Sequence, residues 1–164
     1  MNPIRVIVHG AAGKVGQEVI KAVSGEDDMQ LVGAVDVKAA KDALLLPDGS
    51  SSVPFSTDLG HILARCQPDG RSDSSSAKTT RQAVRLATEK GVNLVIGTTG
   101  FSPDDVKEIE SLAAEHKIGA VMAPNFALGA ILMMHLAKIA AKYLDYAEII
   151  ELHHHLKADA PSGT

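Results

Sequence analysis

The hydrophobic and polar positions of this chain follow two alternating periods, one typical of buried strands and one typical of amphipathic helices. The predicted strands are short apolar runs rich in β-branched residues, at Ile4–His9, Leu31–Asp36, Asn93–Gly97, Ile118–Ala123 and Ala147–His153. The predicted helices lie between them, at Lys14–Ser24, Asp58–Arg65, Thr79–Lys90, Pro103–His116 and Ala127–Leu144. This order is typical of an α/β protein with a parallel sheet and helices on both faces.

Residues that favour helix ends support two of these boundaries. Gly91 follows the helix at Thr79–Lys90, and glycine is common at that position because it adopts a left-handed backbone without strain. Ser102 precedes the next helix, which begins with Pro103 and two aspartates. A serine cap, a proline at the first position and acidic residues in the first turn all favour a helix N-terminus.

One segment interrupts the alternation. Residues 67–76, Gln-Pro-Asp-Gly-Arg-Ser-Asp-Ser-Ser-Ser, are polar at the place where a buried strand is due between two helices. The composition favours a surface loop. The alternative interpretation is that the sequence has been altered here. If the segment is real and lies inside the sheet, Arg71 would be costly there unless its side chain reached solvent.

A glycine-rich turn follows the first strand and opens the first helix. Gly10, Gly13 and Gly16 have the spacing G-x-x-G-x-x-G, which permits a tight turn, a close approach to a pyrophosphate and close packing of helix on strand. Asp36 ends the second strand about 20 residues later, where a carboxylate binds an adenosine ribose. This pattern predicts dinucleotide binding; the alternative is a glycine turn that serves packing alone. Asp36 favours NAD, but Lys38 is either a solvated lysine or a partner for the 2′-phosphate of NADP.

Two further segments follow predicted strands at the edge of the sheet where doubly wound folds bind ligands. Gly97–Phe101 places two threonines between glycines, which suits a ligand-binding loop or an ordinary strand-to-helix turn. Ala123–Phe126 ends the next strand in an equivalent position. Asn125 is either a hydrogen-bond partner for a carboxamide such as that of nicotinamide or a turn-forming residue.

The last residues combine proton carriers, a cation and a small hydroxyl-bearing loop. His153, His154 and His155 are followed by Lys157 and by Ser162–Thr164. Histidine transfers protons near neutral pH, and a loop of this kind can bind a carboxylate through backbone N–H groups. This combination suits a small dianionic acid whose carbon receives a hydride. The alternatives are a solvated strand end and a metal site, but no second set of ligands completes a zinc shell.

Composition and charge exclude several classes of protein. The net charge is −4, aromatic residues make up 3% and tryptophan is absent, which argues against a nucleic-acid surface. Cys66 is the only cysteine, so no internal disulfide forms, which favours a reducing compartment. We find neither a signal peptide nor an apolar run long enough to cross a membrane. These features predict a cytoplasmic protein.

Taken together, these segments resemble the 4-hydroxy-tetrahydrodipicolinate reductase family, also called dihydrodipicolinate reductases, of bacterial lysine and diaminopimelate synthesis. The resemblance covers nearly the whole chain. It rests on Gly10–Gly16, Gly97–Phe101, Ala123–Phe126 with Gly129, and above all on the motif Glu-x-His-His-x-x-Lys-x-Asp-Ala-Pro-Ser-Gly-Thr at Glu151–Thr164.

The resemblance implies a set of site residues. It implies that His153 is the acid/base residue, that Lys157 donates a proton, and that His154, Gly163 and Thr164 bind substrate. The implied cofactor-binding residues are Gly10, Ala11, Ala12, Gly13, Lys14, Val15, Gly16, Asp36, Gly97, Thr98, Thr99, Ala123, Pro124, Asn125 and Phe126. No metal is implied.

The resemblance also implies an activity. NADH or NADPH would reduce 4-hydroxy-tetrahydrodipicolinate, a small dicarboxylate, to tetrahydrodipicolinate with loss of water. The partners implied are this substrate and three further copies of the chain in a homotetramer, with no nucleic acid and no membrane. The cofactor carries the hydride, and the protein supplies orientation and charge.

This sequence departs from the family pattern in two places. The family continues beyond the motif into a full substrate domain, whereas this sequence stops at Thr164. We therefore expect a Rossmann-like doubly wound parallel sheet at 1–126, and at 127–164 only the first helix and strand of an incomplete α+β substrate domain. Such a fragment would leave an open sheet edge and an uncovered apolar face, which makes a tetramer doubtful.

The second departure lies in the polar segment. Where the family has an apolar strand ending in Asp-Phe and a hydroxyl residue, this chain has Gly70–Ser74 followed by Ser75. Asp73 and Ser75 fit the pattern, but the apolar run and the phenylalanine are missing. A buried parallel strand is normally apolar. The hypotheses are a reading-frame or sequencing error, or decay in a shortened gene.

Three functions compete. The first is a reductase of this family, and the second is a catalytically inactive fragment that binds NAD(P)(H). The third is a different Rossmann oxidoreductase, such as a semialdehyde dehydrogenase, which lacks support because Cys66 lies in the wrong region for a catalytic cysteine. Only the segment from His153 to Thr164 distinguishes the first function from the second.

Overall fold

The computed structural model describes residues 2–152 and divides the chain into two compact units. The first unit is Met1–Met122 and the second is Ala123–Thr164. Each unit is described by itself below.

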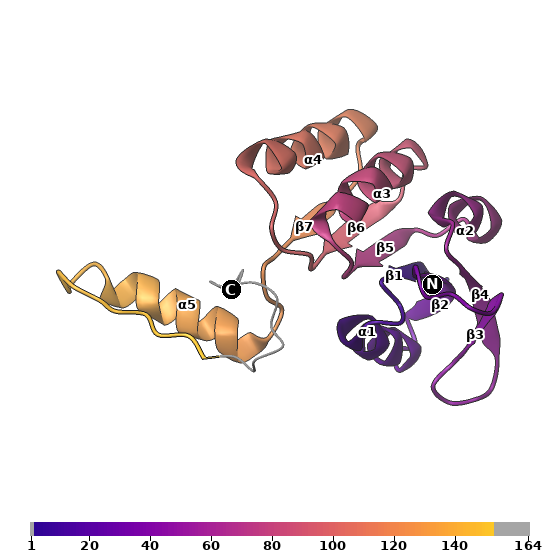
Figure 1. The fold of residues 1–164 in the computed structure, drawn as a ribbon, viewed down its shortest axis with the longest axis horizontal. Coiled ribbons are helices and arrows are strands. Elements are labelled where there is room, and N and C mark those ends of the chain that lie inside the picture. The colour runs from indigo at the N-terminus through magenta and orange to yellow at the C-terminus, as the bar shows by residue number, and fades with distance from the viewer. Residues whose placement is uncertain (1, 153–164) are drawn as a thin grey trace. The chain divides into compact units, whose positions relative to one another are not determined.

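A seven-stranded sheet forms the centre of the first unit (Figure 1). Its strands are β1 (Ile4–His9), β2 (Met29–Val35), β3 (Ala43–Leu45), β4 (Ser52–Ser56), β5 (Gly70–Asp73), β6 (Asn93–Ile96) and β7 (Ala120–Met122). Their order in the sheet is β3-β4-β2-β1-β5-β6-β7. Every neighbouring pair is parallel except β3 with β4. The order reverses between β1 and β5, which makes their carboxyl ends the switch point of a doubly wound fold.

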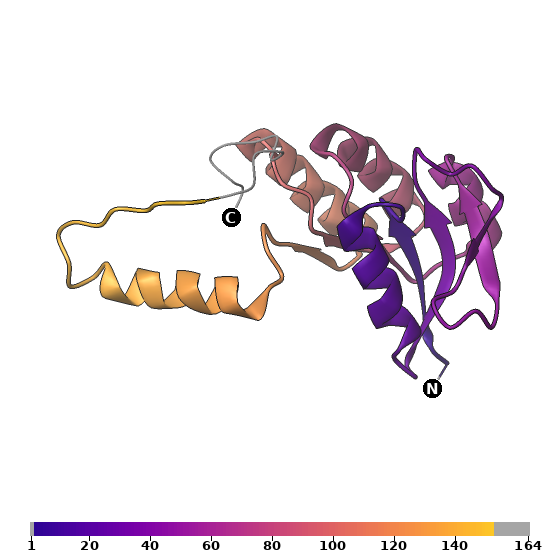
Figure 2. The ribbon, with the colours of Figure 1, turned by 60° about the horizontal axis from the view of Figure 1, so that its bottom comes forward.

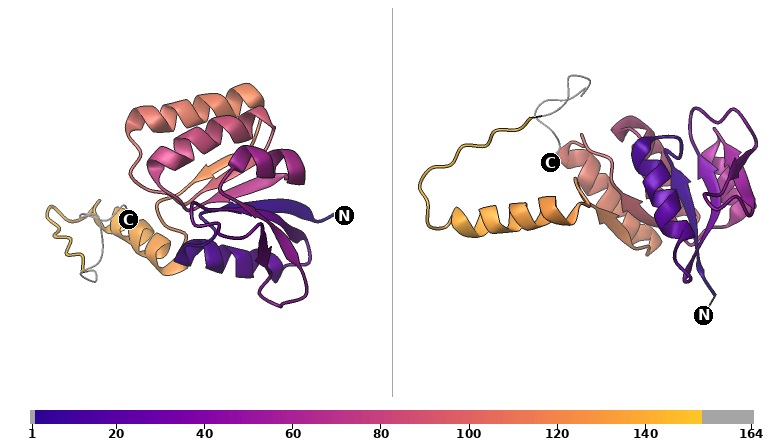
Figure 3. Two further views of the ribbon diagram at one scale, coloured as in Figure 1. Left: turned by 45° about the vertical axis from the view of Figure 1, so that its right-hand side comes forward. Right: turned by 90° about the horizontal axis from the view of Figure 1, so that it is seen from below.

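Helices cover both faces of this sheet, as Figures 2 and 3 show. Helix α1 (Lys14–Ser24) packs on one face. The other face carries α2 (Leu59–Cys66), α3 (Ala77–Glu89) and α4 (Pro103–His116). The predicted Rossmann-like parallel sheet is confirmed.

The alternation of side chains along β1 separates two hydrophobic cores. Val6 and Val8 point toward α1 and pack with Ile20. Ile7 points to the opposite face and packs with residues of α2, α3 and α4, among them Ile62. Because successive side chains of a strand lie on opposite faces, β1 contributes to both cores and is buried on both sides.

Most predicted elements are present with small shifts at their ends. The strand at Ile4–His9 and the helix at Lys14–Ser24 have the predicted bounds. Helix α4 has the predicted serine cap: the Ser102 hydroxyl accepts a hydrogen bond from the Asp105 N–H, and the Asp105 carboxylate accepts one from the Ser102 N–H. Gly91 follows α3 with a φ of +70°, the left-handed backbone expected after a helix.

The polar segment is a strand, so the prediction of a surface loop at Gly70–Asp73 is wrong. Strand β5 lies between β1 and β6 and pairs in parallel with both. The expectation that Arg71 needs solvent is also wrong, because its side chain is buried with 1% exposed. Pairing with β1 and β6 satisfies the backbone N–H and C=O groups of β5 whatever its side chains are. A buried carboxylate, that of Asp73, balances the charge of Arg71.

Two short strands escaped prediction. Strands β3 and β4 form an antiparallel pair at one edge of the sheet. Pro54 lies in the middle of β4, and serines are the first and last residues of this strand. Proline and serine lower the strand signal. Strand β4 lies between β3 and β2, and its pairing with β2 begins only at Phe55, after the proline.

The second unit contains one described helix, α5 (Leu128–Ala140), close to the predicted Ala127–Leu144. None of its residues is buried. The predicted strand at Ala147–His153 is wrong for 147–152, which have no strand structure, and His153 lies outside the described residues. A strand needs a partner for its backbone groups, and none of the described residues of this unit supplies one. Within 2–152 no helix combines the length and the apolar character needed to cross a bilayer.

Candidate functional site

The glycine turn joins β1 to α1 and depends on the absence of side chains. Gly10 has a φ of +84°, and a Cβ there would lie 3.0 Å from the Ser74 carbonyl group. A Cβ on Gly16 would lie 2.1 Å from the Gly10 oxygen, which no conformation of the turn would tolerate. The turn is thus packed against the end of β5 on one side and against α1 on the other.

The N-terminus of α1 faces this turn without a side-chain cap. Gly13 occupies the N-cap position and makes no side-chain hydrogen bond, and the first turn of α1 contains no acidic residue. The free N–H groups and the positive end of the helix dipole therefore remain available to an anion such as a pyrophosphate.

Asp36 connects the glycine turn to the end of β2. Its Oδ2 accepts a hydrogen bond of 2.9 Å from the Ala12 N–H, and its Oδ1 accepts one of 2.9 Å from the Lys38 N–H. A carboxylate oxygen has two lone pairs, so each oxygen retains capacity for a further donor such as a ribose hydroxyl. The side chain of Asp36 is held in place before any ligand binds.

A cleft of about 280 Å³ opens beside Asp36. Its walls come from the ends of β1, β2 and β5 and from the start of α3, and they consist of His9, Gly10, Gly13, Asp36, Val37, Lys38, Ser74, Ser75, Ser76 and Thr79. The volume suits the adenosine half of a dinucleotide better than a whole one. The glycine turn, the uncapped start of α1 and the carboxylate of Asp36 all meet at this cleft.

A larger hollow of about 590 Å³ lies at the other end of the strands, lined in part by Pro68, Asp69 and Asn93. It has no glycine turn and no helix N-terminus. Parallel α/β sheets bind ligands beyond the carboxyl ends of their strands. The smaller cleft is therefore the candidate site.

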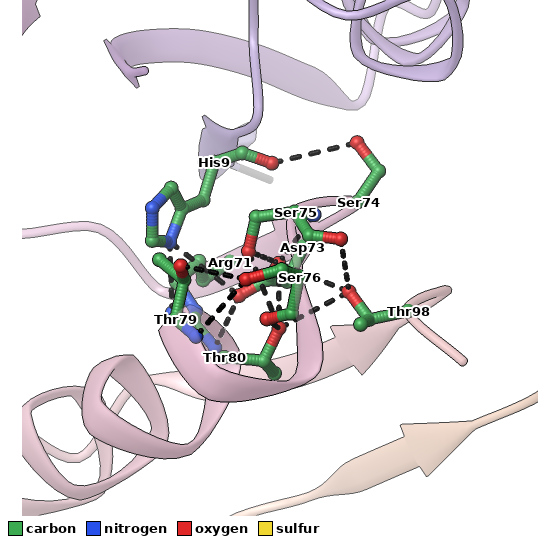
Figure 4. Close-up of polar contacts among 9 residues, drawn as sticks. All are labelled: His9, Arg71, Asp73, Ser74, Ser75, Ser76, Thr79, Thr80 and Thr98. Carbon is green, nitrogen blue, oxygen red and sulfur yellow. Dashed lines mark hydrogen bonds and ion pairs between the residues drawn. The ribbon is translucent and has the colours of Figure 1, made fainter. Parts of the chain in front are cut away.

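Asp73, the last residue of β5, is the centre of a buried hydrogen-bond network behind the cleft (Figure 4). Its Oδ1 lies 2.9 Å from the Ser75 N–H nitrogen and 2.7 Å from the Ser75 hydroxyl. The hydroxyls of Thr80 in α3 and Thr98 after β6 lie 3.1 Å and 3.3 Å from the same oxygen. One carboxylate thereby ties the ends of two strands to the start of a helix.

Arg71 and His9 lie on the other side of this carboxylate. The Nη2 of Arg71 is 3.1 Å from the Asp73 Oδ2, a distance that makes an ion pair, but the two groups are not aligned for a hydrogen bond. Burial raises the pKa of Asp73, but the neighbouring His9 ring, the Arg71 charge and the Ser75 hydroxyl together hold it well below its ordinary range. Burial lowers the pKa of Arg71, and the charge of Asp73 opposes that shift; a guanidinium stays protonated in either case.

The predicted threonines of the loop after β6 lie next to this network. Thr98 is 6% exposed, and its hydroxyl turns inward to Asp73 and to Thr80, whose hydroxyl lies 3.1 Å away. Gly97 donates its N–H to the Asp73 carbonyl at 2.9 Å. Thr99 is more exposed than Thr98. The structure thus brings Gly97 and Thr98 together with the end of β5.

The remaining predicted residues lie in the second unit. Asn125 accepts a hydrogen bond of 2.8 Å from the Ala127 N–H just before α5, and Phe126 is exposed. His153, His154, Lys157, Gly163 and Thr164 lie outside the described residues. Among the residues that the structure describes, no group of three or more histidines, cysteines and acidic residues is placed to bind a metal.

Two family profiles match consecutive parts of this chain. One is described as the N-terminus of dihydrodipicolinate reductase and matches residues 4–126. The other is described as the C-terminus of the same enzyme and matches residues 129–164. The chain belongs to the dihydrodipicolinate reductase family. Members of this family are pyridine-nucleotide-dependent reductases.

Curated relatives within the dihydrodipicolinate reductase family agree with this assignment. A 4-hydroxy-tetrahydrodipicolinate reductase of Dehalococcoides mccartyi is 56% identical over 164 residues, which is 100% of this chain and 62% of the relative. One of Geobacillus kaustophilus is 42% identical over 163 residues, with 98% of this chain and 62% of the relative covered. The chain therefore spans about three fifths of the length of these relatives.

Solved structures give the same result. A dipicolinate-bound dihydrodipicolinate reductase from Paenisporosarcina sp. TG-14 has a TM-score of 0.79 and 39% identity, and the match covers 98% of this chain and 62% of that one. A homoserine dehydrogenase from S. aureus has a TM-score of 0.64 at 16% identity over 75% of this chain and 33% of that one. The second similarity shows the shared fold alone.

Sequence reasoning missed the group formed by His9, Arg71 and Asp73. His9 was predicted only as the end of a strand, and the segment around Arg71 was predicted to be a loop. One signal was present: His9 and Asp73 each end a strand, and the carboxyl ends of neighbouring parallel strands meet at one edge. That these two strands are neighbours was not visible in the sequence.

Proposed function

We propose that this chain carries the nucleotide-binding part of an NAD(P)H-dependent 4-hydroxy-tetrahydrodipicolinate reductase. The observation that supports this most directly is the cleft between the glycine turn, Asp36 and Ser74–Ser76 in a member of this family. The reaction would reduce 4-hydroxy-tetrahydrodipicolinate to tetrahydrodipicolinate with loss of water. It would serve lysine and diaminopimelate synthesis.

Each part of the cleft has a proposed role toward the cofactor. The uncapped N-terminus of α1 would bind the pyrophosphate, and the glycines would let it approach the backbone. Asp36 would accept hydrogen bonds from the adenosine ribose. The bound nicotinamide would supply a hydride to the substrate.

Five residues at the end of the chain would serve the substrate. His153 would act as acid and base, and Lys157 would donate the proton that balances the hydride. His154, Gly163 and Thr164 would bind the dicarboxylate. These roles come from the family motif, and the ligand of the Paenisporosarcina relative, dipicolinate, is a small dicarboxylate.

Both cofactors would bind, with a preference for NADH. Asp36 favours a free ribose 2′-hydroxyl, whereas Lys38 lines the same cleft and would attract the 2′-phosphate of NADPH. Asp36→Ala should weaken NADH binding by about 10- to 100-fold, since hydrogen bonds to charged groups contribute about 1.5–3 kcal/mol. Lys38→Ala should weaken NADPH binding and leave NADH binding unchanged. Fluorescence titration of both variants with both cofactors tests this, and equal loss of both in Lys38→Ala would contradict it.

The overall proposal is tested by titrating the purified chain with NADH and then adding freshly prepared substrate. Binding followed by substrate-dependent loss of NADH fluorescence supports a reductase. No binding contradicts the proposal as a whole.

A catalytically inactive NAD(P)-binding fragment is the second candidate. One observation favours it: α5, which precedes the catalytic motif, has no buried residue. In the same titration this candidate predicts NADH binding without turnover. His153→Ala separates the two, because it removes turnover from an enzyme and changes nothing in a fragment that only binds.

A further inference from the structure

The imidazole of His9 lies between a cation and an anion at the end of β1. Its Nδ1 is 3.3 Å from the Nη1 of Arg71 and 3.4 Å from the Oδ2 of Asp73. The ring is almost fully enclosed, with 6% of the residue exposed. Figure 4 shows its other nitrogen on the side away from Arg71 and Asp73.

Nδ1 can serve only one of these two neighbours. A guanidinium has N–H donors and no acceptor, so a hydrogen bond with Arg71 requires a free lone pair on Nδ1. A carboxylate only accepts, so a hydrogen bond with Asp73 requires a proton on Nδ1. The choice determines which ring nitrogen carries the proton of the neutral imidazole.

The other hydrogen bonds of the two neighbours favour Arg71 as the partner of Nδ1. Among the described residues, the Nε and Nη2 of Arg71 have no hydrogen-bond partner, so His9 is the acceptor on which this buried guanidinium depends. The Oδ1 of Asp73 already has donors from Ser75, Thr80 and Thr98. Its Oδ2 makes no hydrogen bond among the described residues, so the 3.4 Å contact with His9 is not aligned for one, whereas the contact of His9 with Arg71 is. A buried charged donor left without any acceptor is costly, whereas Asp73 keeps its three donors and its ion pair with Arg71 in either tautomer of His9.

With Nδ1 occupied, the proton of the neutral ring lies on Nε2. This nitrogen makes no hydrogen bond to any residue within 2–152, yet it is not one of the buried atoms without a partner, so it reaches solvent. His9 is also one of the residues that line the cleft beside Asp36 and Lys38.

We propose that Arg71 is a positioning residue that holds His9 in the Nε2–H tautomer, and that His9 Nε2–H donates a hydrogen bond to a ribose or phosphate oxygen of the nucleotide in the cleft. The contact rests on the proposed function, whereas the tautomer does not. Arg71 then takes part in nucleotide binding without touching the nucleotide.

A matched pair of substitutions tests the contact. Glutamine at position 9 offers its carbonyl oxygen to Arg71 and its N–H near the place of Nε2, whereas methionine has a similar length and neither group. NADH titration should show His9→Gln within about twofold of the wild type and His9→Met weaker by about 3- to 10-fold, the effect of one hydrogen bond. Thermal unfolding of both variants checks that they are folded.

The tautomer is tested on the chain without nucleotide. Two-bond ¹⁵N–¹H spectra distinguish a protonated from an unprotonated ring nitrogen, and they are recorded above the ordinary pKa of histidine, about 6.5. The wild type should show Nε2–H. Arg71→Met should shift His9 toward Nδ1–H, because the Asp73 carboxylate then remains as the neighbour of Nδ1, and should weaken NADH binding by a similar factor to His9→Met. Arg85→Met, which removes an exposed arginine paired with Glu108, should change neither quantity.

The results of these experiments distinguish a wrong tautomer, a wrong His9 contact and a wrong proposed function. An Nδ1–H tautomer in the wild type overturns the role of Arg71. If His9→Met and His9→Gln both bind NADH as tightly as the wild type, the contact is overturned and the proposed function stays in place. No NADH binding by the wild type overturns the proposed function together with the contact, whatever the tautomer.

Discussion

Arg71 and Asp73 form a buried ion pair whose two members are supported unequally. Asp73 accepts hydrogen bonds from three neighbouring residues in addition to its contact with Arg71. Arg71 relies on His9 and on the charge of Asp73. Removing one partner of a buried pair leaves the other uncompensated, and the cost depends on what else that partner contacts.

Substitution of each partner should therefore have unequal effects. Asp73→Ala should lower the free energy of unfolding by about 3–5 kcal/mol, because it leaves the Arg71 guanidinium buried without a counter-charge. Arg71→Met should change stability by about 1 kcal/mol or less, or raise it, because Asp73 keeps its donors and an apolar side chain suits a buried strand. Urea unfolding measures both. An equal loss in the two variants would contradict the asymmetry.

Gly16 shows a second effect at the scale of single residues, the exclusion of any side chain. Gly16→Ala should lower the free energy of unfolding by about 1–3 kcal/mol, because the new Cβ, 2.1 Å from the Gly10 oxygen, forces the turn and α1 apart. NADH affinity should fall with it. Gly129→Ala in α5 is the control: a Cβ there meets no atom within 4 Å, so stability should stay equal or increase. An NADH affinity unchanged in Gly16→Ala would mean that the turn does not form the site.

At the scale of elements, α4 has the most complete local determinants. Its capping box, its proline and two aspartates in its first turn lie within four consecutive residues, 102–105. Arg81 of α3 also forms an ion pair of 2.7 Å with Asp105. Helix α5 differs, because its N-cap residue Ala127 makes no side-chain hydrogen bond. The start of α4 is thus determined by local sequence to a greater degree than that of α5.

Loss of the cap should have a cost that depends on pH. Ser102→Ala should lower the free energy of unfolding by about 1 kcal/mol, whereas Ser50→Ala, in an exposed loop, should change it by less than about 0.5 kcal/mol. The Ser102 N–H, then Arg81, lowers the pKa of Asp105 to about 2. A lowered pKa means that Asp105 stabilises the fold above its unfolded pKa, about 3.9, and that this contribution disappears as pH falls toward 2.

The comparison with Asp105→Asn measures that contribution. The difference in stability between the wild type and Asp105→Asn should be constant near neutral pH and should shrink below pH of about 4. A difference that stays constant to the lowest pH would contradict the role of the carboxylate charge.

At the scale of the molecule, the two units differ in how they bury apolar surface. The first unit has a core on each side of its sheet. In the second unit Leu132, Met133 and Leu136 of α5 are 52%, 62% and 55% exposed. Exposed apolar surface on this scale is typical of a region that contacts other protein surface.

The 164-residue chain should therefore bind an apolar dye and self-associate. Replacing Leu132, Met133 and Leu136 together by glutamine should reduce both effects and leave NADH affinity within about twofold, because the cleft lies in the other unit. Exchange of the same three residues between leucine and methionine keeps the apolar surface and is the control. Sedimentation and dye fluorescence measure the outcome, and equal association in both variants would locate the contact elsewhere.

Local sequence was sufficient for the segment from β1 to Asp36. The glycine spacing, the period of α1 and the carboxylate after β2 each depend on residues close along the chain, so these elements were predictable. The walls of the cleft that come from β5 and α3 were not. The same holds for the cap of α4. The predicted roles of the five residues from His153 onward remain predictions that rest on the family motif.

Tertiary structure alone decided the nature of β5 and of the group behind the cleft. Gly70–Asp73 has the composition of a loop, and it is a strand because β1 and β6 satisfy its backbone on both sides. His9 and Arg71 are 62 positions apart in the sequence, and only the parallel pairing of their strands brings them together. A buried charge is acceptable only where partners of opposite charge or free lone pairs surround it, and those partners come from strands and helices that the local sequence does not connect.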